Sequence, residues 1–156
     1  MAKKISRNTF LTDNSPSIKA FASIAGSKES EGPIGTCFDK IETDSYFGQD
    51  TWEKAESELQ KQTVGLAISK AGLKDADIDY ILSGDLINQC IGTTYGLRSL
   101  NIPFLGIYGA CSTMAEGLLL GSLLTDSGIG GNIAAATSSH FSTAERPVSY
   151  THLRAH

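Results

Sequence analysis

The sequence predicts an α/β fold in which a mostly parallel sheet is covered by helices. From residue 50 onward, segments with helical spacing of apolar residues alternate with short apolar runs, in the order helix, strand, helix, strand, helix, strand. These runs are nearly continuous, which is typical of parallel strands buried on both faces. A polar or glycine-containing segment follows each run. Right-handed crossovers are expected, with ligands gathering at the carboxyl ends of the strands.

Composition narrows the class of protein. The chain has 156 residues, 40% of them hydrophobic, with a net charge of −4 and no basic run that would indicate nucleic acid or a membrane surface. Three widely spaced cysteines argue against a disulfide framework, and no spacing of ligands indicates a metal. Nucleotide-binding glycine motifs are absent, so we predict no cofactor. Neither a signal peptide nor an apolar run of the roughly 20 residues that a membrane span needs is found, which favours a reducing, cytoplasmic-side location.

The first third of the chain contains less regular patterns. Residues 1–16 are predicted to form a polar tail or an edge segment, and Ser17 to Ala25 a first strand. Residues 26–49 are interrupted by glycines and a proline, which predicts a long loop with a functional or interface role. Cys37 within it is expected to be a loop or packing residue.

A helix is predicted to follow, with Asp50 as its cap, Glu53 completing a capping box and Gly72 ending it. Three of its charged residues are expected in solvent, namely Glu56, Lys61 and Lys70. Helical spacing predicts a buried face formed by Trp52, Ala55, Leu59, Thr63, Leu66 and Ala67.

Strands are predicted at residues 78–83, 104–108 and 132–137, with helices between them at about 86–100 and from Cys111 to the glycine cluster at 128–131. The apolar residues expected to face inward from the last helix are Met114, Leu118, Leu119 and Leu123.

Three polar clusters fall at the carboxyl ends of these strands, where a ligand site is expected. They are residues 84–88, 109–112 and 138–140. The candidate ligand-binding residues that they contain are Cys111, Ser112, Asp85, Asn88, Ser139 and His140.

Cys111 is the most informative of these residues. A thiol at the start of a helix lies near unpaired N–H groups and the positive end of the helix dipole, which favour thiolate or a bound anion. The alternative is that Cys111 is a small buried hydrophobic residue. Likewise His140 is either a base or a structural histidine, and Asp85 either caps the second helix or contacts a ligand. Ser112 is either a site residue or a residue of the helix start without a chemical role. The pair Glu145-Arg146 is either a functional pair or a solvated surface pair.

Several motifs in order resemble a known family. The segment GACS at 109–112, with DID at 77–79 and GDLINQ at 84–89, resembles the first half of a thiolase-type protein. Together with GPIGTCFDK, TWEKAE, IPFLGIYGACSTMAEG, AATSSH and TAER, these segments are similar to the stage V sporulation protein AD family of endospore-forming bacteria. The resemblance covers roughly residues 16–146.

This resemblance implies a thiolase-like fold of two similar α/β halves, of which this chain is the N-terminal half, in a protein that is a homodimer when full length. It implies binding of dipicolinic acid, alone or as its calcium chelate, and its uptake into the forespore. The site would be the pocket that corresponds to the thiolase substrate site, with Cys111 as a pocket residue. The resemblance does not imply covalent chemistry at Cys111, and we predict that the pocket is used without catalysis. Membrane proteins of the same sporulation operon are the implied partners, at the cytoplasmic side of the inner spore membrane, and nucleic acid is not a partner.

Two alternatives stay open. The first is an acyltransferase of the thiolase or ketoacyl-synthase type, with Cys111 as the nucleophile. The second is a gene fragment without function.

The chain is predicted to divide into two parts after its first 16 residues. Residues 17–146 are predicted to form the thiolase-like half. Residues 147–156 are predicted to be a non-native tail from an adapter or read-through, because the family pattern is not followed there.

Overall fold

The computed structural model describes residues 2–87 and 90–139. Within them the strands are β1 (Lys3–Ser6), β2 (Thr9–Leu11), β3 (Ile24–Gly26), β4 (Lys40–Glu42), β5 (Tyr80–Gly84), β6 (Phe104–Gly106) and β7 (Ile133–Thr137). The helices are α1 (Ser27–Ser30), α2 (Trp52–Lys70), α3 (Ile91–Leu97) and α4 (Thr113–Asp126), with 3₁₀ turns at Gly35–Cys37, Asp75–Asp77, Arg98–Leu100 and Ala110–Ser112.

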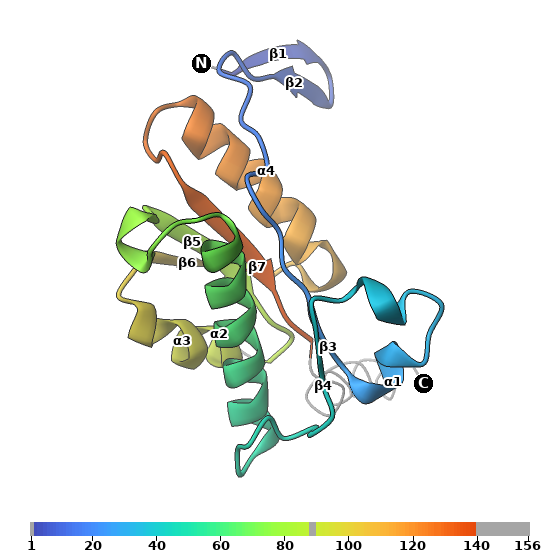
Figure 1. Ribbon diagram of the computed structural model, residues 1–156. Coiled ribbons are helices and arrows are strands. Elements are labelled where there is room, and N and C mark those ends of the chain that lie inside the picture. The colour runs from blue at the N-terminus through green and yellow to red at the C-terminus, as the bar shows by residue number, and fades with distance from the viewer. Residues whose placement is uncertain (1, 88–89, 140–156) are drawn as a thin grey trace, which may run out of the picture.

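The central sheet confirms the predicted α/β class. Its strand order is β6-β5-β7, and both pairings are parallel. Adjacent residues of β5 point to opposite faces, as pleating requires. Ile81 packs toward α2 and α3, whereas Leu82 packs against α4. Helices therefore cover both faces of the sheet, as Figure 1 shows.

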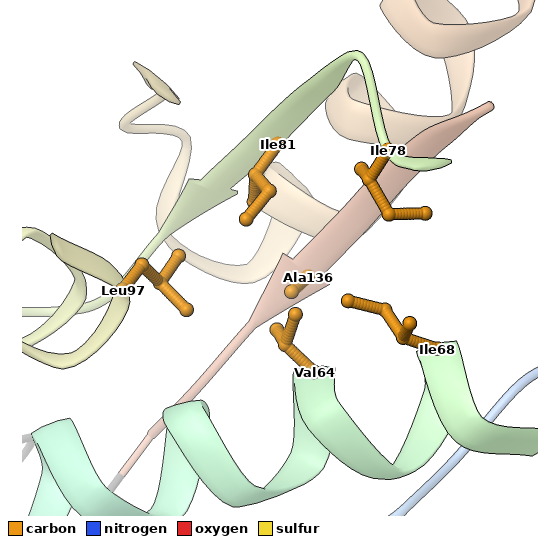
Figure 2. Close-up of a cluster of buried hydrophobic side chains, with 6 residues drawn as sticks. All are labelled: Val64, Ile68, Ile78, Ile81, Leu97 and Ala136. Carbon is orange, nitrogen blue, oxygen red and sulfur yellow. The ribbon is translucent and has the colours of Figure 1, made fainter. Parts of the chain in front are cut away.

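The hydrophobic core lies between α2 and the sheet. Figure 2 shows side chains from α2, α3 and the strands converging in this layer. Its members are Val64, Ile68, Ile78, Ile81, Leu97 and Ala136. Since its members range from residue 64 to residue 136 of the chain, this cluster joins the elements on that face into one unit.

The predicted helix at residues 50–72 is confirmed, but its cap and its buried face differ from the prediction. The N-cap is Thr51, whose Oγ1 accepts a hydrogen bond from the Lys54 N–H at 3.3 Å, and Gly72 follows the helix with φ +70°. Glu56, predicted to lie in solvent, is fully buried. The residues of α2 that are buried are Ala55, Glu56, Gln60, Val64 and Ile68. The buried face differs from the predicted one because Glu56 and Gln60 form hydrogen bonds at the end of the sheet, which apolar spacing alone does not reveal.

The predicted inward face of α4 is wrong. Met114, Leu118 and Leu119 are 38%, 46% and 46% exposed, and Leu123 is half-buried. The sheet instead contacts a face of small residues, which includes Gly117. A Cβ atom on Gly117 would lie 3.2 Å from the Ala135 Cβ. The helix axis approaches the sheet so closely that no large side chain fits between them, and the long apolar side chains point elsewhere.

The N-terminal third is more ordered than predicted. The first strand is only Ile24–Gly26, because residues 17–23 form no strand. The expected long loop at 26–49 is also wrong, since it contains α1, a 3₁₀ turn and β4, which pairs in parallel with β3. Residues 1–16, predicted as a tail or edge segment, contain the antiparallel hairpin β1–β2 from residue 3 to residue 11.

The second predicted helix is shorter than residues 86–100. It begins at Ile91, after Cys90 in the left-handed region at φ +52°, and ends in the 3₁₀ turn Arg98–Leu100. In the part of the chain that the structure describes, no helix combines the length and apolar character that crossing a bilayer requires.

Candidate functional site

The carboxyl ends of the three central strands lie side by side, as their parallel order requires. The Ile107 N–H donates to the Ser83 carbonyl at 3.0 Å, which continues the β5–β6 pairing beyond β6. On the other side, the Ser138 N–H donates to the Gly84 carbonyl at 3.2 Å. The segments that follow β5, β6 and β7 therefore start from one edge of the sheet.

The turn at Gly109–Ser112 forms the candidate site at that edge. Ser112 donates to the Gly109 carbonyl through its N–H at 2.9 Å and through its Oγ at 2.7 Å. The Gly109 N–H donates to Thr113 Oγ1 at 3.1 Å, and Ala110 is left-handed at φ +48°. This closed 3₁₀ turn leads directly into α4.

Two donors of this turn are unpaired. Within residues 2–87 and 90–139, the N–H groups of Ala110 and Cys111 donate to no acceptor. Successive N–H groups around a left-handed residue form a concave site that binds anions, and the positive end of the α4 dipole acts in the same direction. The predicted anion preference therefore has a backbone basis.

The side chains of Cys111 and Ser112 are exposed, so the alternative of Cys111 as a small buried hydrophobic residue does not hold for this chain. Cys90 fits that description instead. It is 7% exposed, and its Sγ lies 3.5 Å from the Ile107 carbonyl oxygen. Burial raises the pKa of the Cys90 thiol, which keeps it protonated and unreactive. Cys37 is exposed, as expected of a loop residue.

Glu116 is a site residue that the sequence analysis missed. A Cβ atom on Gly109 would lie 2.8 Å from Glu116 Oε2 and 2.6 Å from Ser112 Oγ, so the carboxylate lies directly against the turn. A larger residue at position 109 would push the ends of these two side chains away from the turn. A negative charge beside an anion-binding turn weakens the binding of a free anion. The signal available in the sequence was the position of Glu116 in the first turn of the helix after Cys111.

Asp85 is buried, with 1% of its surface exposed, and both carboxylate oxygens are occupied. Oδ1 accepts a hydrogen bond from the Ile87 N–H at 2.8 Å, and Oδ2 accepts bonds from the N–H and hydroxyl of Thr93 at 2.6 and 2.5 Å. Because Thr93 lies in the first turn of α3, the geometry favours the capping role among the two expected for Asp85.

A second group of polar residues connects α2 with the ends of β5 and β7, and its α2 members, Glu56 and Gln60, were also missed. Ser138 Oγ donates to Glu56 Oε1 at 2.8 Å. Gln60 Nε2 donates to Ser83 Oγ at 2.9 Å, and that hydroxyl donates to the Ala136 carbonyl at 3.0 Å. The i, i+4 spacing of Glu56 and Gln60, continued by Val64 and Ile68, was the signal that could have placed both on the buried face.

Comparison with known proteins decides the family. The family model for stage V sporulation protein AD (SpoVAD) matches residues 6–154. The chain belongs to this family. It is 40% identical over 148 residues to stage V sporulation protein AD of Bacillus subtilis (strain 168), an alignment that covers 95% of this chain. The chain spans 44% of the length of that relative, so the match concerns a part of a longer family member. The resemblance drawn from the ordered motifs is confirmed.

The structure brings only some of the predicted site residues together at an exposed position. Cys111 and Ser112 lie together in the exposed turn, Ser139 is exposed just beyond β7, and Asp85 is buried. Asn88 and His140 lie outside the described residues, as does the segment 147–156, so the predictions for them stay predictions.

Proposed function

We propose that this sporulation protein binds dipicolinic acid at the Gly109–Ser112 turn and assists its uptake into the forespore, without covalent catalysis. The supporting observation is the pair of unpaired N–H groups of Ala110 and Cys111 at the exposed start of α4. Dipicolinate carries two carboxylates on one ring, and backbone donors at a helix start are suited to such groups. In this proposal the exposed Ser139, just beyond β7, is a further ligand residue, and Asn88 and His140 stay candidates from the sequence.

The charge around the turn bears on the form of the ligand. The Glu116 carboxylate lies against Gly109, so it repels a free dianion. Chelation of calcium by dipicolinate neutralises the ligand and removes that repulsion. We therefore include the calcium chelate among the ligands, with Glu116 selecting for it.

The longer protein supplies the rest of the proposed assembly. Met114, Leu118 and Leu119 form an exposed apolar strip on α4. Such a strip supports a packing partner, which we assign to the second half of a thiolase-like family member. In the same proposal the full-length protein is a homodimer, peripheral to the cytoplasmic side of the inner spore membrane, and it works with membrane proteins of the same operon.

The exposed thiol of Cys111 also supports the second candidate, an acyltransferase of the thiolase type. In that reaction the Cys111 sulfur attacks the thioester carbonyl, and coenzyme A leaves as its thiol. Mass spectrometry after incubation with acyl-coenzyme A separates the two proposals. A stable acyl adduct on Cys111 favours the enzyme.

The binding proposal is tested by calorimetry of the full-length protein with dipicolinate, with and without calcium. Cys111→Trp fills the exposed turn and is expected to abolish binding. Cys37→Trp is the matched control, because Cys37 is also exposed but lies in another part of the chain. Absence of binding by the wild-type protein would reject the proposal, and equal binding by the two variants would reject this location.

A further inference from the structure

The hairpin β1–β2 differs in charge from the chain that carries it. Residues 2–12 contain Lys3, Lys4 and Arg7 and no acidic residue, whereas the whole chain has a net charge of −4. All three cationic side chains are exposed. Positive charge is therefore concentrated on a hairpin of a protein that is otherwise acidic.

Two large aliphatic side chains are exposed among these cations. Ile5 and Leu11 are each 59% exposed. Lys3 and Leu11 are directly opposite each other in the antiparallel register, so their side chains share a face. Ile5 lies where the register shifts between Lys4 and Ser6. The hairpin thus presents Lys3 beside Leu11 on one face, with a second exposed aliphatic side chain at Ile5.

The hairpin projects from the body of the domain but is held at its base. Figure 1 shows it beyond one end of α4, away from the central sheet, and among the described residues its two strands pair only with each other. Just after the hairpin, the Asn14 N–H donates to Asp126 Oδ1 at 2.8 Å, and Asn14 Nδ2 donates to the Asp126 carbonyl at 2.7 Å. These bonds attach the hairpin to the C-terminal end of α4.

We propose that the β1–β2 hairpin binds the surface of an anionic lipid bilayer. Cations next to exposed aliphatic side chains match the phosphate layer and the acyl boundary of such a bilayer. A projecting two-stranded hairpin can reach a flat bilayer without a shaped groove, which favours lipid over an acidic protein surface. The inference does not depend on dipicolinate binding, since the hairpin contains none of the candidate ligand residues.

The test is sedimentation of the full-length protein with vesicles of phosphatidylglycerol and phosphatidylcholine, compared with vesicles of phosphatidylcholine alone. Binding is expected only to the anionic vesicles and should fall as salt rises. Replacing Lys3 and Lys4 by Gln is expected to weaken binding on the order of tenfold or more, since each basic residue near the surface contributes about fivefold. The matched control replaces Lys61 and Lys74, which are exposed elsewhere, by Gln and should bind as wild type.

A second measurement reports contact directly. In Ile5→Trp, the added indole is expected to shift its emission to the blue with anionic vesicles only, as its surroundings become apolar. No binding to anionic vesicles, equal binding to neutral vesicles, or unchanged binding of the Lys3 and Lys4 variant would overturn the proposal. If the Lys3 and Lys4 variant still binds vesicles but no longer binds an acidic protein, the hairpin is a binding surface for that protein instead. Dipicolinate affinity, measured on the same variants, should not change, so failure here is distinct from failure of the ligand proposal.

Discussion

Ser138 Oγ donates a hydrogen bond to the buried carboxylate of Glu56 at 2.8 Å, although 82 residues separate them in the chain. Glu56 is 0% exposed and Ser138 is 8% exposed. The bond attaches α2 to the residue that follows β7. It thereby holds the start of the segment that contains Ser139, a candidate ligand residue.

Loss of this bond should destabilise the protein. In Ser138→Ala, the buried Glu56 oxygen loses a donor, and the free energy of unfolding is expected to fall by about 1–3 kcal/mol. Urea unfolding of the full-length protein measures the change. Ser139→Ala is the control, because Ser139 is adjacent but exposed, and its effect should stay within about 0.5 kcal/mol. Equal effects of the two substitutions would contradict the assigned role of Ser138.

Glu116→Gln should strengthen the binding of free dipicolinate by roughly threefold to tenfold, because it removes about 0.6–1.4 kcal/mol of Coulomb repulsion near the turn. The gain should shrink when calcium is present. Calorimetry measures both, and Glu31→Gln in an exposed position at the end of α1 serves as the control. A loss of affinity in Glu116→Gln would mean that the carboxylate assists the ligand.

Asp79 should make stability depend on pH. Its carboxylate accepts hydrogen bonds from the N–H groups of Asn132 at 3.0 Å and Gly131 at 2.7 Å, which hold the pKa of Asp79 below its ordinary value. A group with a lowered pKa in the folded state stabilises above its unfolded pKa, about 3.9, and this contribution is lost as the pH falls through the folded value.

Asp79→Asn is therefore expected to lower the melting temperature at neutral pH, with a difference from wild type that shrinks as the medium becomes acidic. Thermal melts across the acid range measure the effect. Asp75→Asn, in an exposed turn nearby, is the control and should melt as wild type at neutral pH. A difference that stays constant with pH would exclude the charged form of Asp79 as its source.

The close approach of α4 to the sheet predicts opposite responses of two helical glycines. Gly65→Ala on α2 has open space around the new methyl group and should stabilise the protein by about 0.5–1 kcal/mol. Gly117→Val places a branched side chain against Ala135 and should destabilise it by about 1–3 kcal/mol. Chemical unfolding measures both, and tolerance of Gly117→Val would show that α4 can move away from the sheet.

The sequence by itself determined the fold class, the order of elements from residue 50 and the position of the Cys111 turn. These features depend on local patterns: helical spacing, glycine and proline boundaries, and continuous apolar strands. The ordered motifs likewise identified the family, which the comparisons confirm.

Only the tertiary structure decided which face of each helix is buried. Glu56 and Gln60 are buried because their polar groups meet partners at the ends of β5 and β7, which are distant in sequence. On α4, apolar spacing predicted leucines toward the sheet, yet Gly117 and Gly121 lie there because the helix packs too closely for larger side chains. Local spacing records how hydrophobic a face is, but burial depends on distance and on partners, and both arise only when the chain is folded.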